Sequence, residues 1–525
     1  MKRPVGFAFL LVALLLTACG GAGSAASSPP ASSGGDELTY AASTFGQENF
    51  DPSQTPTPYA GAGLGGPIFE SLFMFMPPSG ELKPYLLQSA TMAADGMSWT
   101  FKLRDGIKFS NGDPMSADDV KFSLERYISN QSRTTMRKTL GAAISSMDVA
   151  DRLTVKLNLR TPVIDLPNVF APNPGSEGIV LPAKYIQKVG WKAFAEKPIG
   201  SGPYVLTDHK PGQSVTYAAN PNYWRAKPLF KKITTLLIPE EQTRISMMES
   251  GKADLADISP INKAPVEKAG LKTLIIPDAT TNMVQFIGAY GSYPDNPLKK
   301  LEVRKALTLA VDKKAILNAL GAGLGELASI GPSKPGISPG APELPATPYD
   351  PTEAKRLLAQ AGYPNGFDLT FWATNGVCTA DFSKQLGQTL GSYWQKIGVN
   401  TTISPVDYAV FRPKAQANPF KPETVGTAYP FCNGPQEGIR DLINRFYSKG
   451  AQHTSDLADP YIPKALAAKK LEDQQQYVDA AYRKVYENYA ALPIYYGSLV
   501  FAADGRAAGD RIAKGVPFVM SWWVK

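Results

Sequence analysis

Apolar and polar residues alternate along parts of this chain with the period of a strand, and along other parts with the period of a helix. Between Ser98 and Leu103 every second residue is apolar, which predicts a strand with one buried face. Ser116 and Asp119 have the spacing of a capping box, in which both side chains accept hydrogen bonds from free N–H groups of the first helical turn. The helix that they open carries Val120 and Leu124 on one face.

Longer helical stripes follow in the C-terminal half. Asp350 and Pro351 are the expected N-cap and first residue of a helix that Gly362 ends. Two further apolar stripes with helical spacing run from Phe382 to Ile397 and from Tyr477 to Tyr489, and both predict a buried core face. Because strand-like and helix-like segments alternate throughout, the pattern favours a mixed α/β architecture with more than one domain.

The N-terminus has a different composition, which predicts a lipoprotein signal and a tether. A basic start precedes the apolar run Val5–Leu16, which is too short to span a bilayer. Leu16–Cys19 has the form of a lipobox, so Cys19 is expected to carry a thioether-linked lipid and to become the mature N-terminus. The alternatives are an ordinary secretory signal with a chance cysteine, and a short membrane anchor. Every residue from Gly20 to Gly35 is Gly, Ala, Ser or Pro, which predicts a flexible tether.

Composition indicates a large soluble body outside the cell and argues against several partners. No apolar stretch after the signal approaches the roughly 18 residues that a transmembrane helix needs. The net charge of +8 is spread over 525 residues without a basic block, so nucleic acid is not an expected partner. Apart from Cys19, the chain has Cys378 and Cys432, and an oxidising exterior favours a disulfide between them over two free thiols. His209 and His453 are the only histidines, and no metal site or other cofactor is expected.

Several segments resemble the signatures of a known family. Trp99–Phe109 and Asn111–Phe122 closely resemble the signature of the peptide/nickel class of ABC-transporter solute-binding proteins, family 5, which includes dipeptide- and oligopeptide-binding proteins. Later segments are similar to further signatures of this family, with Ser201 where threonine is usual: Pro198–Leu206, Asn222–Trp224, Met247–Leu255, Val303–Lys313 and Tyr349–Tyr363.

The resemblance implies an α/β, two-lobed periplasmic-binding-protein (Venus flytrap) fold with an extra subdomain on the first lobe. Carried onto this chain, it predicts a signal peptide at 1–19, a tether at 20–36, a first lobe at 37–66, 197–280 and 494–525, the extra subdomain at 67–196, and a second lobe at 281–493. The implied function is capture of a small solute between the lobes and its delivery to ABC permease subunits. We expect a monomer that is lipid-anchored on the extracytoplasmic face of the cell membrane, in a periplasmic or an extracellular setting.

The resemblance places ligand recognition in part at the second-lobe loop Gly426–Glu437. Peptide-binding relatives have an aspartate in this loop that pairs with the α-amine of the peptide, whereas here the first acid is Glu437. This difference disfavours ordinary peptides, and the scarcity of histidine disfavours nickel chelates. The ligand classes that remain open are a modified peptide, an oligosaccharide, an opine-like conjugate or another organic solute. Asp51, Arg304 and Arg440 are further charged candidates. The candidate ligand-binding residues are Phe50, Asp51, Trp372, Tyr429, Phe431, Cys432 and Asn433. The aromatic residues among them either stack on a ligand or fill space in the protein core.

A secreted, lipid-anchored hydrolase is the alternative function. Gly336–Gly340 fits the pattern G-x-S-x-G, but the prolines around it oppose the strand and helix that a nucleophile elbow requires. His209, in a predicted hairpin turn, and His453, in a polar loop, are poorly placed as bases. Asp118 and Asp119 are adjacent and so point about 100° apart on a helix, which favours capping over a catalytic pair. We therefore do not expect an enzyme.

Overall fold

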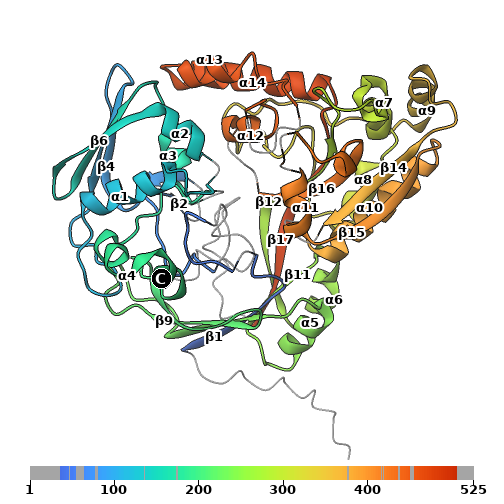
Figure 1. Cartoon of the computed structure of the whole chain (residues 1–525). Coiled ribbons are helices and arrows are strands. Elements are labelled where there is room, and N and C mark those ends of the chain that lie inside the picture. The colour runs from blue at the N-terminus through green and yellow to red at the C-terminus, as the bar shows by residue number, and fades with distance from the viewer. Residues whose placement is uncertain are drawn as a thin grey trace, which may run out of the picture.

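A computed structural model of the chain has two lobes that are joined by long strands (Figure 1). It describes residues 36–46, 48–54, 64–76, 81–134, 136–172, 175–374, 378–415, 417, 419–434, 438–449 and 455–504. Cys19 with most of its tether, Glu437 and His453 lie outside the described residues, as does the side chain of Asn433.

One mixed sheet runs through both lobes in the described part of the chain, in the order β15-β14-β16-β12-β17-β11-β1-β10-β9-β8, with β13 paired to β17. Its strands are β1 (Glu37–Ala42), β8 (Tyr204–Lys210), β9 (Ser214–Ala219), β10 (Lys232–Leu237), β11 (Leu255–Ile258), β12 (Lys272–Ile287), β13 (Gly325–Leu327), β14 (Asp368–Thr374), β15 (Asn400–Val406), β16 (Thr427–Asn433) and β17 (Ala491–Ala503). We call the part of the molecule built on β1 and β8 to β11 the first lobe. The part built on β13 to β16 is the second lobe.

The strands β12 and β17 each pass from one lobe into the other. The first part of β12 pairs with the last part of β17, beside β11 of the first lobe. After a register shift between Ile276 and Thr280, β12 pairs with the first part of β17, beside β16 of the second lobe. Asp278 lies within this shift and has a φ of 54°, a conformation that aspartate adopts more readily than most residues. We call Ile276–Thr280, with the facing residues of β17, the hinge.

The described residues of the extra subdomain form a four-stranded antiparallel sheet, β4-β5-β7-β6, a two-stranded sheet and four helices. Ser116 N and Oγ donate to Asp119 Oδ2 at 2.8 and 2.9 Å, so the predicted capping box opens α1. The strand predicted at Ser98–Leu103 is β5, and its apolar face is buried. The elements are β2 (Phe73–Met76), β3 (Glu81–Pro84), β4 (Leu87–Met92), β5 (Ser98–Leu103), β6 (Ile144–Asp151), β7 (Thr154–Leu159), α1 (Ala117–Ile128), α2 (Arg137–Ala143), α3 (Leu166–Val169) and α4 (Ala183–Glu196).

The remaining helices cover the large sheet and the top of the molecule in Figure 1. Asp350 caps α9 as predicted, because its side chain accepts from Glu353 N at 2.9 Å. The stripe predicted to reach Tyr489 is shorter, since α14 ends at Glu487 and Tyr489 has a φ of 47°. The helices are α5 (Glu241–Glu249), α6 (Lys263–Lys268), α7 (Leu301–Leu309), α8 (Lys313–Leu320), α9 (Pro351–Gln360), α10 (Ala380–Gln395), α11 (Tyr408–Ala415), α12 (Gly438–Arg445), α13 (Ile462–Ala467) and α14 (Leu471–Glu487), with short 3₁₀ turns at Pro260–Asn262, Pro297–Lys299 and Pro422–Thr424.

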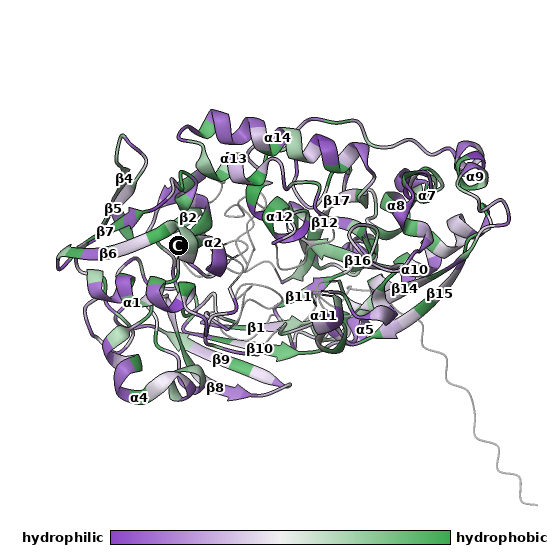
Figure 2. Ribbon diagram, turned by 45° about the horizontal axis from the view of Figure 1, so that its top comes forward, coloured by the Kyte–Doolittle hydropathy of each residue, from purple (hydrophilic) through white to green (hydrophobic). Residues whose placement is uncertain are grey.

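The buried apolar residues show which parts pack together. A first-lobe core surrounds β1, and a second-lobe core lies between the sheet and α7 to α10. A further core joins the extra subdomain to α12, α13 and α14, so these helices contact both sides of the molecule. Hydrophilic and hydrophobic residues both mark α14 in Figure 2, as expected for an amphipathic helix. Within the described residues, no helix has the length and apolar character to cross a bilayer.

Candidate ligand site between the lobes

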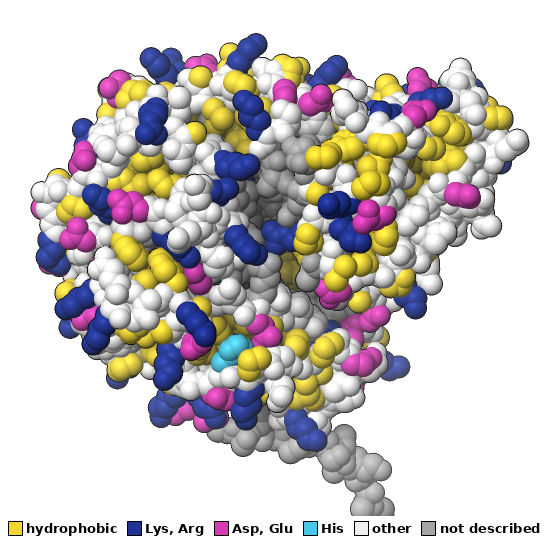
Figure 3. All heavy atoms as spheres, viewed as in Figure 1, with side chains coloured by type: hydrophobic (Ala, Val, Ile, Leu, Met, Phe, Trp, Pro, Cys, Tyr) yellow, Lys and Arg dark blue, Asp and Glu magenta, His cyan; other side chains and the backbone are white. Residues whose placement is uncertain are grey.

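The molecular surface is hollowed between the two lobes, in the centre of Figure 3. On the second-lobe side, β16 and β12 pair near the hinge, and α12 follows β16 in the chain. The family resemblance predicts a ligand loop at Gly426–Glu437, but Thr427–Asn433 of this segment form the strand β16 and not a loop. The residues around this strand and α12 are the first to consider.

Arg440 of α12 forms an ion pair with Glu177 of the extra subdomain. Arg440 Nη2 donates to Glu177 Oε2 at 2.9 Å, and the two side chains are 1% and 0% exposed. Burial raises the pKa of Asp165 to about 6, while its hydrogen bond with Asn168 and the charge of Arg440 act in the opposite direction. The cation that the sequence offered as a ligand partner is therefore engaged by a protein carboxylate.

A second buried ion pair lies within α12. Arg445 Nε donates to Asp441 Oδ1 at 2.6 Å, and Tyr482 OH of α14 donates to Asp441 Oδ2 at 3.1 Å. Burial raises the pKa of Asp441 to about 6, against the lowering effects of the Arg445 charge and these two hydrogen bonds. The guanidinium carbon of Arg445 is 3.7 Å from the ring centroid of Phe431, a cation–π contact. In this cluster each arginine is matched by a carboxylate.

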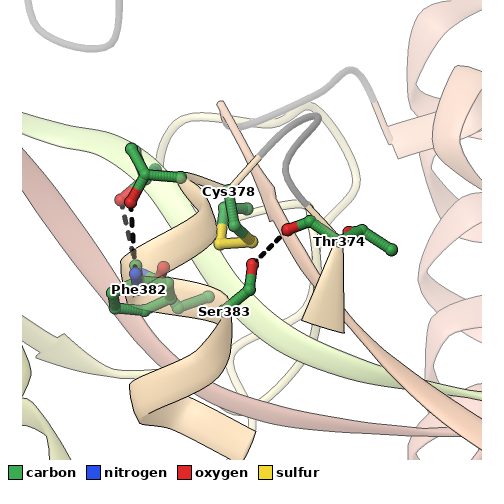
Figure 4. The surroundings of a disulfide bond; sticks show 8 residues. Thr374, Cys378, Phe382 and Ser383 are labelled. Atoms are coloured by element: carbon green, nitrogen blue, oxygen red, sulfur yellow. Dashed lines mark hydrogen bonds between the residues drawn. A yellow bond between two sulfur atoms is a disulfide. The ribbon is translucent and has the colours of Figure 1, made fainter. Parts of the chain in front are cut away.

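Cys378 and Cys432 form a disulfide, as predicted, with their Cα atoms 5.1 Å apart (Figure 4). Cys378 directly precedes α10, whose first turn is capped by Thr379 and whose Ser383 Oγ donates to Thr374 O at 2.5 Å. The bond ties the start of α10 to β16 across a sequence separation of 54 residues. In the chain-entropy description such a loop stabilises the fold by about 4 kcal/mol before strain is subtracted.

The candidate aromatic residues of the second lobe pack together with Phe411 of α11. The ring of Phe411 lies 5.9 Å from that of Trp372 and 5.0 Å from that of Tyr429. Tyr429 is 6% exposed and Phe431 is 3% exposed, whereas Trp372 is half-buried and donates from Nε1 to Thr427 Oγ1. Tyr429 and Phe431 thus act as packing residues in this conformation, and Trp372 is the more accessible ring.

The first-lobe candidates also have protein partners. Phe50 is buried in the first-lobe core with its ring 5.3 Å from that of His209. Asp51 Oδ1 accepts from Ser53 N at 2.8 Å and from Ser53 Oγ at 2.7 Å, and Asp51 Oδ2 lies 3.3 Å from Arg126 Nη2. The carboxylate of Asp51 is therefore already paired with a cation of the extra subdomain.

Arg304, the other charged candidate, has a structural role. Its guanidinium donates to the carbonyl oxygens of Leu298, Lys299 and Asn488 at 2.8 to 3.1 Å. It also lies 4.6 Å from the ring centroid of Tyr290. These bonds hold the start of α7 against the end of α14.

The residues of the hydrolase pattern do not form a nucleophile elbow. Segment 328–350 is described throughout and contains no strand before Ser338 and no helix after it. Ser338 Oγ accepts from Lys334 N at 3.0 Å. His209 lies in β8 and not in the turn as predicted, because the strand extends to Lys210, and its Nε2 is 3.2 Å from Glu48 Oε1.

Glu70 is a buried carboxylate that no pattern in the sequence marks. Its Oε2 accepts from Ser201 Oγ at 2.9 Å and from Trp224 Nε1 at 2.8 Å, and its Oε1 accepts from Tyr223 OH at 3.0 Å. Burial raises the pKa of Glu70 to about 7 in spite of these bonds. Two segments that carried the family resemblance thus meet on one carboxylate, between the extra subdomain and the first lobe. Glu177 also lacks a sequence signal beyond the flanking Gly175 and Gly178.

Among the residues that the structure describes, no group of three or more His, Cys, Asp or Glu side chains could hold a metal ion. The groups that the described part of the site does contain are the half-buried ring of Trp372 and the ion pairs around α12.

Comparison with known proteins agrees with this architecture. Residues 81–428 match the family described as "Bacterial extracellular solute-binding proteins, family 5 Middle". The chain is 29% identical over 381 residues to heme-binding protein A of Haemophilus influenzae, and the match covers 66% of each protein. It is 30% identical over 328 residues to the glutathione-binding protein GsiB of Escherichia coli, with 62% of each protein covered. The chain thus spans just under two thirds of the length of these relatives.

Solved structures with low sequence identity share the fold. One is AgaA of A. tumefaciens in complex with agropinic acid, with a TM-score of 0.77, 23% identity, and coverage of 93% of this chain and 98% of AgaA. Another is DppA of Helicobacter pylori in complex with the peptide STSA, with a TM-score of 0.77, 19% identity, and coverage of 93% and 98%. The predicted two-lobed α/β fold is confirmed.

Proposed function

Because the chain belongs to family 5 of the bacterial extracellular solute-binding proteins, we propose that it captures a small solute between its lobes and delivers it to the permease of an ABC importer. The observation that carries the proposal is the passage of β12 and β17 through both lobes, with a break in their pairing at the hinge. Rotation about two strands closes the lobes on a ligand, so that ligand binding selects the closed form that the permease recognises. No bond of the solute is made or broken.

The proposed ligand is an organic solute without an exposed α-ammonium group, such as a modified peptide, an opine-like conjugate or an oligosaccharide. Relatives are named for heme and glutathione, and similar structures hold agropinic acid or a peptide, so family membership alone leaves the ligand open. Support comes from the pairing of Asp51 with Arg126 and from the missing loop aspartate. The proposed contacts are Trp372 and Asn433.

The other candidates, Phe50, Asp51, Tyr429, Phe431 and Cys432, support the walls of the site under this proposal. Each is buried against protein partners, and Cys432 is held by its disulfide. Their contribution is to fix the positions of the first-lobe segment and of β16, so that the ligand meets a preformed surface.

A lipid on Cys19 belongs to the same proposal. The Gly/Ala/Ser/Pro segment after it would reach roughly 20 to 25 Å as a random coil, which lets a monomer find its permease while staying at the cell membrane. A lipid-anchored protein of this kind is compatible with a periplasmic location and equally with an extracellular one.

The proposal is tested by identifying the solute. Native mass spectrometry of protein purified without denaturation reveals any co-purified ligand, and thermal-shift screening covers peptides, acetylated peptides, oligosaccharides and metal chelates. A solute at one hundred times its dissociation constant should stabilise the folded state by about 2.7 kcal/mol. Failure of every class to bind, together with ester hydrolysis that Ser338→Ala abolishes, would support the hydrolase instead.

A further inference from the structure

The ion pair between Glu177 and Arg440 crosses from one lobe to the other. Ile179 and Leu181, just after Glu177, lie in the same core as Leu38 of β1, so this part of the extra subdomain is fixed to the first lobe. Arg440 lies in α12, which follows β16 of the second lobe, and 263 positions separate it from Glu177. Rotation of the lobes about the hinge would therefore pull the two residues apart.

The first-lobe side of this contact is shaped to receive a guanidinium group. Met136 N donates to Glu177 Oε1 at 2.7 Å and Ser176 N donates to Glu177 Oε2 at 3.1 Å, which orients the carboxylate through bonds that do not involve Arg440. A Cβ atom at Gly175 would lie 2.2 Å from Arg440 Nη2 and 2.2 Å from Glu177 Oε2. Glycine at this position is what allows the arginine to reach the carboxylate.

A second close contact, between Gly178 and Phe170, fixes the segment 175–178 that carries Glu177. A Cβ atom at Gly178 would lie 1.9 Å from the carbonyl oxygen of Phe170. Phe170 in turn belongs to the core that also contains Ile439 and Leu442 of α12. Apolar contacts and the ion pair thus join the same two parts of the molecule, and the partners on both sides are protein atoms.

We propose that Arg440 and Glu177 form a latch that stabilises the closed arrangement of the lobes. Both charges are removed from water when the latch is shut, and each has a geometrically defined partner there, so the pair favours the one arrangement in which the partners meet. Since a ligand of the cleft and the latch favour the same state, the latch increases the affinity for a ligand without contacting it. The role of the latch in ligand binding rests on the proposed capture function. Its effect on lobe closure can be tested without any ligand.

The test is small-angle X-ray scattering of the intact protein with no solute added. Arg440→Gln and Glu177→Gln should each raise the ratio of open to closed molecules by about tenfold, because either change leaves a buried charge without its partner in the closed state. The double variant should be less open than either single variant, since it leaves no buried charge without a partner, and this non-additivity shows that the two residues act as a pair. Arg483→Gln is the matched control, because Arg483 pairs with Asp479 inside α14 and that pair is exposed.

An unchanged scattering profile in Arg440→Gln, with a circular dichroism spectrum and Tm like those of the original protein, would overturn the latch. If that variant does not fold, Glu177→Gln carries the same test, because it keeps the shape of the side chain. A scattering profile of the original protein that already corresponds to widely separated lobes would also refute it. Lobe separation is measured here without a ligand, so a failure to find any transported solute would count against the proposed function and not against the latch.

Discussion

Lys334 of the second lobe forms an ion pair with Asp278, at the point where β12 and β17 lose register. Both side chains are 8% exposed, and Lys334 Nζ is also 3.0 Å from Glu326 Oε2. The segment that carries Lys334 is held on β17 by Tyr496, whose OH donates to Ile330 O at 2.7 Å. The pair therefore fixes the backbone at the place where the lobes are proposed to rotate.

Lys334→Met should destabilise the protein, because the buried carboxylate of Asp278 loses its cation. The expected fall in the free energy of unfolding is about 3 to 5 kcal/mol, measured by urea titration. Asp278→Asn in the same background should recover part of the loss, since asparagine tolerates a positive φ and carries no charge. Lys231→Met, which breaks an exposed pair with Asp36, is the control and should change stability little. Equal losses in the two lysine variants would contradict a special role for the hinge pair.

The raised pKa of Glu70 should make stability depend on pH. The pKa of this group is about 7 in the folded state, against an ordinary value of 4.5. Between these values the folded protein retains a proton that the unfolded chain has released, so this group's contribution to stability is present at low pH and is lost as the pH rises through about 7. The size of the loss is about 3 kcal/mol at most.

The variant Glu70→Gln should flatten this dependence. Free energies of unfolding are compared at about pH 5 and about pH 8, and the difference between the two values should shrink relative to the original protein. Some slope should persist, because burial also raises the pKa values of Asp165 and Asp441. Glu81→Gln, at an exposed site, is the matched control and should keep the full dependence. An unchanged slope in Glu70→Gln would show that Glu70 titrates normally.

Features that depend on neighbouring residues were predictable from the sequence. The Ser116 and Asp119 capping box and the Asp350 N-cap involve backbone groups three residues away, so their geometry follows from helix formation alone. The disulfide followed from cysteine number and compartment, because only two cysteines remained to pair.

Features that depend on how distant parts meet could not be predicted in this way. Periodicity indicates that a residue such as Tyr429 is on a strand, but not whether its ring faces a ligand or packs against Phe411. The partner of Arg440 lies 263 positions away, and the bonds around Glu70 join three separate segments. Buried charges of this kind become visible only when the packing of the lobes is known.

Lipidation of Cys19 predicts that the protein fractionates with membranes. Cys19→Ala removes the thiol that would carry the lipid, so the variant should appear in the soluble fraction or remain unprocessed. Fractionation followed by immunoblotting measures this, with Cys378→Ala as a control that alters a different cysteine and should leave the protein with the membrane. Unchanged membrane attachment of Cys19→Ala would contradict the lipobox assignment.

Unmodified di- and tripeptides should bind poorly. A peptide enclosed between the lobes would bury its α-ammonium group, which is costly by several kcal/mol without a carboxylate partner. Asp51 is paired with Arg126, Glu177 with Arg440, and Asp441 with Arg445. Acetylating the amine removes the charge, so an acetylated peptide should bind at least as tightly as the free one in isothermal titration calorimetry.

Variants of the two remaining acids decide whether the protein supplies this charge in another way. Glu437→Gln and Asp51→Asn each remove one carboxylate that the sequence offers to an amine. Glu437→Gln should not alter the affinity for an amine-free ligand that does not contact this side chain, whereas Asp51→Asn also removes the partner of Arg126, so its effect is judged by comparing free and acetylated forms of the same peptide. If a free dipeptide binds at micromolar concentration and Glu437→Gln abolishes this, Glu437 replaces the missing loop aspartate. If binding is equally tight, requires the free amine and survives both substitutions, then an unmodified peptide is a ligand and the loop has been misread. The comparison is informative because it changes a single charge on the ligand and a single charge on the protein, so the pairing energy is separated from the contacts of the rest of the peptide.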